Sequence, residues 1–351
     1  MSLTITKTLA AILHKSKHSL IVDEIILPKK LFLYQVLVKI ESSGICGAQI
    51  NEIDALKGPD KFLPHLLGHE AYGKVIEVGP GVTTVNLGDT VILHWRPGTG
   101  GQGLPAEYLW RGNKLNAGWV TTFNNHCVVS ENRVTKITRS PSDKSLLPLL
   151  GCALTTAYGV LTRDTIVKEQ DSILIFGAGG VGLSLIKIAK FLNIKSIVVV
   201  DISENKLNYA KILGASNCVQ FIKKKGTLED LKKIYKNKSP QIAIDTTGNV
   251  EAIEICYEIT AATADIVLVG VPKFGSLVRI HTLPLHFGKS LKGSHGGDAK
   301  PESDIPYLLD LFLSGLLDFS DYPTKSYSLM EINLALENLR NGTAGRMIIN
   351  F

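Results

Sequence analysis

The chain has 351 residues, of which 45% are hydrophobic and 20% charged, with a formal net charge of +6. This composition is typical of a globular protein and argues against a disordered or fibrous chain. The length predicts two domains. No apolar run approaches the roughly 18–20 residues of a membrane helix, and residues 1–30 lack the apolar core of a signal peptide. We therefore expect neither secretion nor a membrane partner.

The five cysteines are few for this length and odd in number. A disulfide framework is therefore not expected, and the cysteine content predicts a cytoplasmic location. Seven lysines lie within residues 223–238 and could form a nucleic-acid patch. No aromatic residues alternate with them as in a nucleic-acid groove, so we expect a solvated helix surface and no nucleic-acid partner.

Short β segments predominate in the first 150 residues. Alternation at 35–40 and 73–78 predicts half-buried strands, and a Gly-Asp turn precedes another strand within 85–93. Residues 97–118 are rich in Gly and Pro and predict a long loop.

The pattern changes near residue 150 to alternating strands and helices. Expected strands at 172–176, 196–200, 241–245 and 265–270 are continuous apolar runs, and expected helices cover 151–162, 180–190 and 203–213. Such runs predict a parallel sheet covered on both faces. Beyond residue 295, helices are expected at 305–317 and 329–341, before an apolar tail at 347–351.

A glycine motif marks a cofactor site in this second region. The stretch 177–182, Gly-Ala-Gly-Gly-Val-Gly, follows an expected strand and opens an apolar helix, and the next strand ends at Asp201. Gly177 allows the tight turn, Gly179 lets a pyrophosphate approach, and Gly182 permits close helix–strand packing. Asp201 would bind the ribose hydroxyls and repel a 2′-phosphate, so the motif favours NAD over NADP.

Three separated segments carry residues that bind metals. Cys46 lies in Gly-Ile-Cys-Gly, His69 in Gly-His-Glu, and Cys152 just before the dinucleotide unit. Two thiolates and an imidazole suit zinc, and three protein ligands leave an open fourth position. Each residue alone is more often a core or satisfied polar residue.

Together with the glycine motif, the Gly-Ile-Cys-Gly and Gly-His-Glu segments resemble the medium-chain, zinc-dependent alcohol dehydrogenase family. The resemblance covers essentially the whole chain. It implies an α/β fold with a GroES-like β domain from residues 1–153 and 295–351, and a doubly wound Rossmann domain from residues 154–294. It also implies one catalytic zinc, NAD as cofactor, and hydride transfer between an alcohol or carbonyl substrate and NAD(H). A homodimer or homotetramer through the cofactor domain is expected.

The resemblance also implies roles for individual residues. The catalytic zinc ligands fall on Cys46, His69 and Cys152, and Glu70 falls where the family has an acidic residue that approaches the zinc. The implied cofactor contacts are Thr156, Gly177, Gly179, Gly180, Val181, Gly182, Asp201, Lys206, Val269, Val271 and, at the pyrophosphate, Arg346. The implied substrate pocket includes Ala48, His94 and Trp95.

The chain departs from the family in two places. It has no cysteine between Cys46 and Cys127, so a second, structural zinc is predicted absent. Ala48 and Asn51 replace residues that relay the alcohol's proton in relatives. Gln49 replaces a carboxylate that often supports the zinc-binding histidine, a role for which Glu52 or Asp54 could substitute.

Several functions remain open at this stage. The substrate could be a simple alcohol, or a polyol, cyclitol or sugar-derived alcohol, since Gln49, Asn51 and His94 favour a polar pocket entrance. A zinc-free reductase of the same superfamily and a non-catalytic NAD-binding protein are the alternatives.

Overall fold

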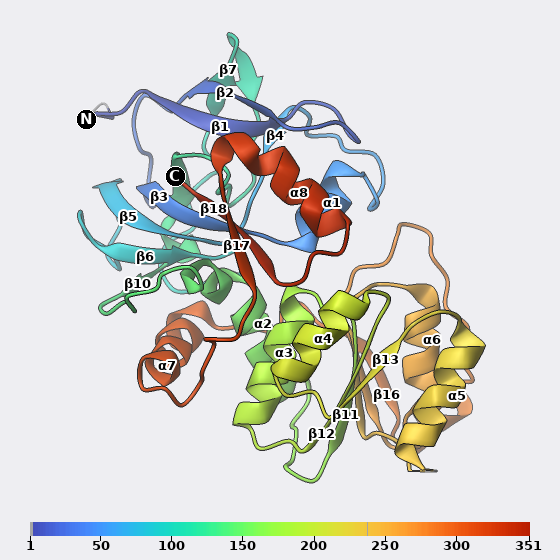
Figure 1. Ribbon diagram of the computed structural model, residues 1–351. Helices are drawn as coiled ribbons and strands as arrows, with labels where there is room; N and C mark the ends of the chain where they lie inside the picture. Colours follow the sequence, from blue (N-terminus) through green and yellow to red (C-terminus); the bar gives the residue numbers. More distant parts are fainter. Residues whose placement is uncertain (1–2, 237) are drawn as a thin grey trace.

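The computed structural model describes residues 3–236 and 238–351, which form two lobes (Figure 1). None of the helices in these residues has the length and apolar character needed to span a membrane. The first lobe contains two β-sheets, and the second contains one parallel sheet between helices.

The first lobe is built mainly from the N-terminal part of the chain. Its larger sheet has the strand order β10 (Val134–Ile137), β6 (Thr90–Leu93), β5 (Ala71–Val78), β3 (Gln35–Ile45), β18 (Arg346–Asn350) and β17 (Thr324–Ser328), with β9 (His126–Ser130) also paired to β3. Its smaller sheet has the order β4 (His65–Leu66), β1 (Lys7–Leu13), β2 (Ile21–Ile26), β7 (Tyr108–Trp110) and β8 (Asn113–Leu115).

The end of the chain returns to this lobe. Strand β18 pairs antiparallel with β3, so that Ile348 lies opposite Gly44, immediately before the Cys46 segment. Helices α1 (Gly47–Ile53) and α8 (Ile332–Arg340) lie beside each other on this lobe (Figure 1). The return agrees with a β domain formed from both chain ends, whereas the boundaries at 153 and 295 stay a prediction.

The second lobe has the predicted parallel sheet. Its order is β13 (Asn217–Gln220), β12 (Ser196–Asp201), β11 (Ser172–Phe176), β14 (Ile242–Asp245), β15 (Asp265–Leu268) and β16 (Ser290–Gly293). Its helices are α3 (Gly180–Phe191), α4 (Glu204–Ile212), α5 (Lys224–Tyr235) and α6 (Val250–Ile259).

Alternate residues of each strand enter opposite hydrophobic cores. Ile173 and Ile175 of β11 pack in the core shared with α3 and α4, whereas Leu174 and Phe176 pack in the core shared with α5 and α6. Because successive side chains of a strand point to opposite faces, a strand buried on both faces has a continuous apolar sequence. The predicted fold class, a doubly wound sheet beside a β domain, is therefore present.

Two expected helices differ in extent from the prediction. The helix expected at 151–162 is a composite of a 3₁₀ turn (Leu147–Gly151), α2 (Ala153–Gly159) and a π-helical turn (Val160–Asp164). The helix expected at 305–317 is α7 (Pro301–Leu313), which begins earlier because Pro301 fits a first helical position and Glu302 and Asp304 favour a helix N-terminus. The remaining 3₁₀ turns are Glu131–Arg133, Leu283–Phe287 and Leu329–Glu331.

Candidate active site

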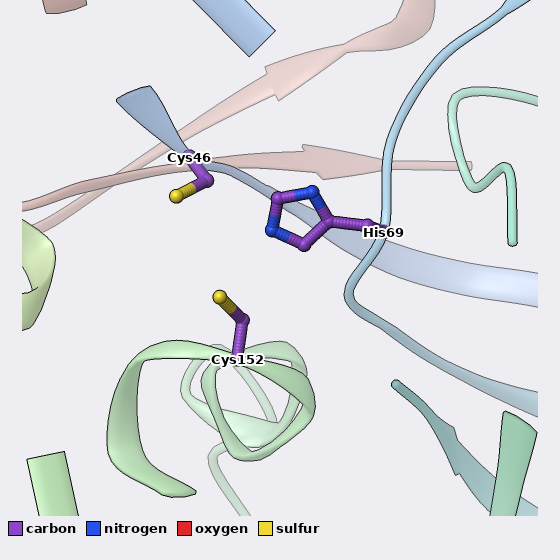
Figure 2. Close-up of side chains that lie close together, drawn as sticks. All are labelled: Cys46, His69 and Cys152. Carbon is purple, nitrogen blue, oxygen red and sulfur yellow. The ribbon is translucent and has the colours of Figure 1, made fainter. Parts of the chain in front are cut away.

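The two cysteines and the histidine predicted as metal ligands lie close together (Figure 2). Cys46 follows β3 and is the N-cap of α1, His69 lies between β4 and β5, and Cys152 lies between a 3₁₀ turn and α2. Their ligand atoms all lie within 4.8 Å of one another. Glu70 is not part of this group.

The surroundings of the two sulfurs favour ionisation of one of them. The neighbouring Cys152 thiol holds the pKa of Cys46 well below its usual range, and the charges of Arg346 and His69 act in the same direction. The neighbouring Cys46, together with burial, raises the pKa of Cys152 well above the usual range. The thiolate is the form of cysteine that binds metals, so Cys46 is prepared as a ligand.

The histidine provides an independent sign of a metal. In Figure 2 the imidazole of His69 points toward the two sulfurs, and its Nε2 atom is buried without a hydrogen-bond partner. A buried polar atom without a partner is costly, and coordination to a metal would remove that cost. Two thiols, one imidazole and an open position form the donor set of a catalytic zinc site.

The side chain that contacts His69 Nδ1 is that of Gln49 rather than that of Glu52 or Asp54. The Gln49 amide nitrogen lies 2.6 Å from His69 Nδ1. Asp54 instead pairs with Arg340, and Glu52 Oε1 lies 4.0 Å from Nε2 of a different histidine, His65. The substitution of either acid for the missing carboxylate is thus not realised in this structure.

Glu70 and Arg346 form a buried ion pair next to the metal ligands. The Arg346 guanidinium donates to Glu70 Oε1, and the side chains of Arg346 and Glu70 are 3% and 0% exposed. Burial raises the pKa of Glu70, although the Arg346 charge opposes that effect. A Cβ added at Gly180 would lie 2.4 Å from Arg346 Nη1. Arg346 therefore reaches from the metal region to the glycine turn.

The glycine turn has the shape that a dinucleotide needs. Gly177 has a φ of +94°, which disfavours other residues. A Cβ at Gly182 would lie 1.8 Å from the Gly177 carbonyl oxygen, whereas a Cβ at Gly179 would meet nothing within 4 Å. The open space at Gly179 lies at the N-terminus of α3, where unpaired N–H groups favour phosphate. The turn thus fits the pyrophosphate of NAD.

Asp201 ends β12 beside this turn. Its carboxylate accepts hydrogen bonds from the backbone N–H of Ala178 at 2.7 Å and of Ser203 at 2.9 Å. These contacts fix the carboxylate at the carboxyl edge of the sheet, where ligands of doubly wound folds bind. Val181 lies half-buried in the first turn of α3, and Lys206 half-buried in that of α4.

The other predicted cofactor contacts lie on two segments. Thr156 is buried in α2, one turn after Cys152, and donates its N–H to the Cys152 carbonyl. Val269 and Val271 follow β15, the first half-buried and the second exposed. All three positions flank the carboxyl edge of the sheet or the metal ligands.

The predicted pocket residues occupy three different environments. His94 is 1% exposed, and its ring nitrogens contact the Arg96 carbonyl oxygen and the Thr135 hydroxyl. Its ring therefore has no free polar group for a substrate. Trp95 packs edge-on against His295 with ring centroids 5.0 Å apart, and Ala48 is half-buried in α1.

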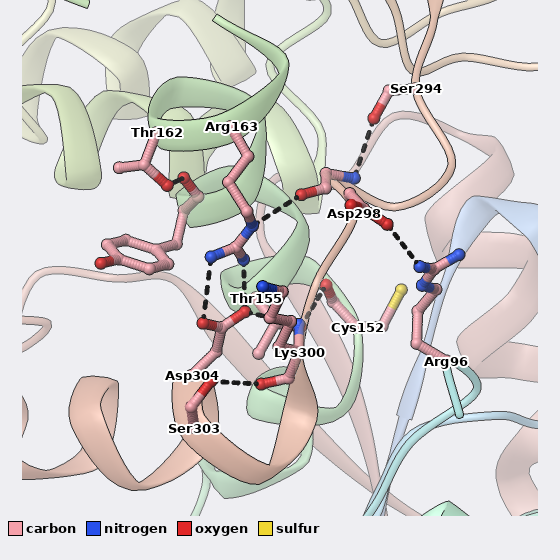
Figure 3. Close-up of polar contacts among 12 residues, drawn as sticks. Arg96, Cys152, Thr155, Thr162, Arg163, Ser294, Asp298, Lys300, Ser303 and Asp304 are labelled. Carbon is pink, nitrogen blue, oxygen red and sulfur yellow. Dashed lines mark hydrogen bonds and ion pairs between the residues drawn. The ribbon is translucent and has the colours of Figure 1, made fainter. Parts of the chain in front are cut away.

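A network that was not predicted from the sequence lies beside Cys152 (Figure 3). Arg163, in the π-helical turn after α2, donates to both carboxylate oxygens of Asp304 in α7 and to the Gly297 carbonyl. Arg96 pairs with Asp298, the residue after Gly297. Arg163 follows the stretch expected as a helix at 151–162, and no sequence pattern links it to Asp304, which lies 141 residues away.

A cavity of about 1150 Å³ lies in the first lobe and reaches Gln49 and His69. Its wall includes Phe32, Leu33, Phe62, Leu104 and Trp119, which are all large and apolar. This cavity was not predicted from the sequence, because its wall comes from five separate segments, 28–35, 49–52, 62–69, 102–107 and 114–121.

Known proteins resemble both lobes. The model of the alcohol dehydrogenase GroES-like domain matches residues 34–139, and that of the zinc-binding dehydrogenase matches residues 180–314. An S-(hydroxymethyl)glutathione dehydrogenase of Aspergillus oryzae is 29% identical over 90% of this chain and 89% of its own. A class-3 alcohol dehydrogenase of Cereibacter sphaeroides is 28% identical over 90% and 93%.

A solved structure extends the similarity to the whole fold. The benzyl alcohol dehydrogenase of Acinetobacter calcoaceticus superposes with a TM-score of 0.86 at 25% identity, covering 99% of this chain and 100% of that one. The resemblance seen in the sequence is thereby confirmed. The chain belongs to the family of medium-chain, zinc-dependent alcohol dehydrogenases, which are NAD-linked oxidoreductases.

Proposed function

We propose that this protein transfers a hydride between an alcohol or carbonyl substrate and NAD(H), with one zinc held by Cys46, His69 and Cys152. The convergence of these three side chains within 4.8 Å supports the proposal more than any other observation. When bound, zinc acts as a Lewis acid on the substrate oxygen. The chain's own residues hold the metal, orient the cofactor and exclude water.

The buried pair of Glu70 and Arg346 prepares the site for charged partners. Cys46 and Cys152 supply negative charge, and the pKa of Arg346 is raised because Glu70 and the two sulfurs outweigh the cost of its burial. We assign Arg346 to the pyrophosphate, because it lies against Gly180 of the glycine turn. Glu70 then balances the Arg346 charge, rather than acting as a permanent ligand of the metal.

The glycine turn and the following strand orient the cofactor. Gly177, Gly179, Gly180, Val181 and Gly182 surround the N-terminus of α3, which favours the pyrophosphate. Asp201 accepts the ribose hydroxyls and repels a 2′-phosphate, and we place Lys206 beside the same ribose. Thr156, Val269 and Val271 are assigned to the nicotinamide.

The lining of the large cavity favours a substrate with an aromatic or long aliphatic body. The cavity reaches His69, although Cys46 and Cys152 do not line it, and its wall is largely apolar. Two of the three polar residues that favoured a polyol are engaged elsewhere, since Gln49 contacts Cys46 and His69 and His94 contacts Arg96 and Thr135. We expect a higher kcat/KM for benzyl alcohol than for sorbitol or S-(hydroxymethyl)glutathione, and the reverse order would contradict this assignment.

Cys46→Ala tests the metal assignment. The variant should lose bound zinc, measured by elemental analysis, and lose NADH formation from alcohols, because one of three ligands is missing. Cys218→Ala is the matched control, since that half-buried thiol lies in the other lobe, where it donates to the Leu207 carbonyl. Full turnover of a metal-free protein would refute the proposal.

We also propose a homodimer or homotetramer formed through the cofactor domain. The segment next to the edge strand β16 exposes large apolar side chains, among them Leu277 and Phe287, and exposed apolar clusters mark interaction surfaces. Leu277→Asp should lower the mass measured by light scattering, whereas Leu87→Asp, an exposed position of the first lobe, should not. A monomeric wild type would exclude this assembly.

The cytoplasm is the proposed compartment. All five cysteines are free, which agrees with a reducing environment. Localisation of a tagged full-length chain by microscopy tests the proposal, and export from the cell would contradict it.

A further inference from the structure

One amide side chain contacts both Cys46 and His69. Gln49 is the third residue of α1 and is 2% exposed. Its Oε1 accepts a hydrogen bond from the backbone N–H of Cys46 at 2.9 Å, and its Nε2 lies 2.6 Å from His69 Nδ1. Gln49 is therefore shared between two of the three proposed zinc ligands.

A zinc-bound His69 makes a specific demand on this amide. Its Nε2 atom is the one directed at the two sulfurs. A neutral imidazole that binds a metal through Nε2 carries its proton on Nδ1, which then acts as a hydrogen-bond donor. The Gln49 NH₂ group is also only a donor. In the orientation described above, two donors would face each other at 2.6 Å.

Turning the amide does not remove the conflict. Rotation would place Oε1 against His69 Nδ1, but it would place the NH₂ group against the Cys46 N–H, which is another donor. The two partners contact different atoms of the amide, Cys46 N–H at Oε1 and His69 Nδ1 at Nε2, so a single oxygen does not serve both positions, whereas a carboxylate has an accepting oxygen for each. Gln49 can therefore satisfy either the Cys46 backbone or the metal-bound His69, but not both together.

We infer that Gln49 is a positioning residue that weakens the hold of this site on zinc, because metal-bound His69 and the Cys46 N–H compete for its single accepting oxygen. Zinc binding breaks the hydrogen bond at the start of α1 or leaves His69 Nδ1 without an acceptor. The inference rests on the proposed function, in which Cys46, His69 and Cys152 bind zinc.

Gln49→Glu tests this inference with a side chain of the same length and two accepting oxygens. Zinc affinity is measured by competition with a chromophoric chelator on the full chain. We expect Gln49→Glu to bind zinc about 10–100-fold more tightly than the wild type, the range by which groups behind metal ligands alter affinity. The absorption spectrum of the Co²⁺-substituted protein should shift, because His69 becomes a stronger ligand.

Asn51→Asp is the matched control. It adds the same negative charge to the same helix at a half-buried position, without a second acceptor between Cys46 and His69. Its zinc affinity should stay near that of the wild type. Equal tightening by Asn51→Asp and Gln49→Glu would show that charge alone acts, and would overturn the inference.

The remaining outcomes separate this inference from the proposed function. Equal zinc affinity of the wild type and Gln49→Glu, with Cys46→Ala binding none, would refute the role of Gln49 alone. No zinc binding by the wild type or by any variant would refute the proposed function and the inference with it. If Gln49→Glu does not fold, Gln49→Asp provides the two oxygens on a shorter side chain, and the same outcomes apply.

Discussion

The cofactor half and the metal half of this site are assembled in opposite ways. The strand, glycine turn, helix and acidic strand end that we propose to bind the pyrophosphate and ribose of NAD come from one stretch, residues 172–201. The proposed metal ligands, Cys46, His69 and Cys152, come from three separate segments. The first half is therefore fixed by local chain geometry, and the second by the packing of distant elements. Arg346, near the C-terminus, contacts both halves.

The largest effect is expected where the two halves meet, from Arg346→Met. Removal of the guanidinium leaves the buried Glu70 charge without its partner. Breaking a buried pair in this way costs about 3–5 kcal/mol. We expect the free energy of unfolding in urea to fall by that amount, and NADH affinity to fall as well.

The double variant Glu70→Gln/Arg346→Met separates the two effects. It removes the uncompensated charge, so it should recover much of the stability without recovering the NADH affinity. If Arg346→Met were as stable as the wild type, the buried pair would not stabilise the contact between the two halves.

The next effect concerns the packing of distant elements alone. Burial lowers the pKa of His94 to about 4 from 6.5. Between pH 6.5 and 4 the unfolded chain binds a proton that the folded chain does not. The contribution of neutral His94 to the free energy of unfolding is therefore fully present above pH 6.5 and is lost as the pH falls toward 4. The expected loss is about 3 kcal/mol, at 1.36 kcal/mol per pKa unit.

Urea denaturation at several pH values measures this loss. In His94→Gln, the free energy of unfolding should fall less between pH 6.5 and 4 than in the wild type, although this variant is less stable at neutral pH. His14→Gln replaces an exposed histidine and should show the same fall as the wild type. An unchanged fall in His94→Gln would show that His94 is not held neutral by burial.

The contrast also explains what the sequence could predict. The parallel sheet and the NAD site were predicted from local patterns, because glycine spacing, a preceding strand and Asp201 all lie within one βαβ unit. The three metal ligands were singled out by residue type, but their joint role came only from the family resemblance, since no local rule brings Cys46 near Cys152. The boundaries of α7 were misplaced because Pro301 was not recognised as a helix start.

Other parts of the site had no sequence signal. The pairing of Arg163 with Asp304 and the contact of Gln49 with His69 depend on the meeting of elements far apart in the chain. His94 was expected in the pocket because relatives line the pocket after this strand, yet its ring turns inward to Thr135. A side chain at a strand end can take either direction, and only the packed structure determines which.

Two glycines of the turn provide a sharper test of the local half. A Cβ at Gly182 would overlap the Gly177 carbonyl oxygen at 1.8 Å, so Gly182→Ala should lower the free energy of unfolding by about 1–3 kcal/mol, the usual cost of overpacking. A Cβ at Gly179 meets no protein atom within 4 Å. Gly179→Ala should therefore keep its stability and lose NADH affinity, measured by fluorescence titration. Equal loss of stability in both variants would mean that the space at Gly179 is not reserved for a ligand.

The smallest effect separates helix capping from cofactor binding in the same local unit. The Ser203 hydroxyl accepts the Lys206 N–H at 3.4 Å as the N-cap of α4, and its loss in Ser203→Ala should cost about 1 kcal/mol. The backbone N–H of Ser203 donates to the Asp201 carboxylate. The substitution does not remove this N–H, so NADH affinity should not change. Asn249→Ala removes the corresponding cap of α6 and should cost a similar amount in thermal or urea unfolding. A fall in NADH affinity for Ser203→Ala alone would mean that this hydroxyl, and not only the Asp201 carboxylate, binds the ribose.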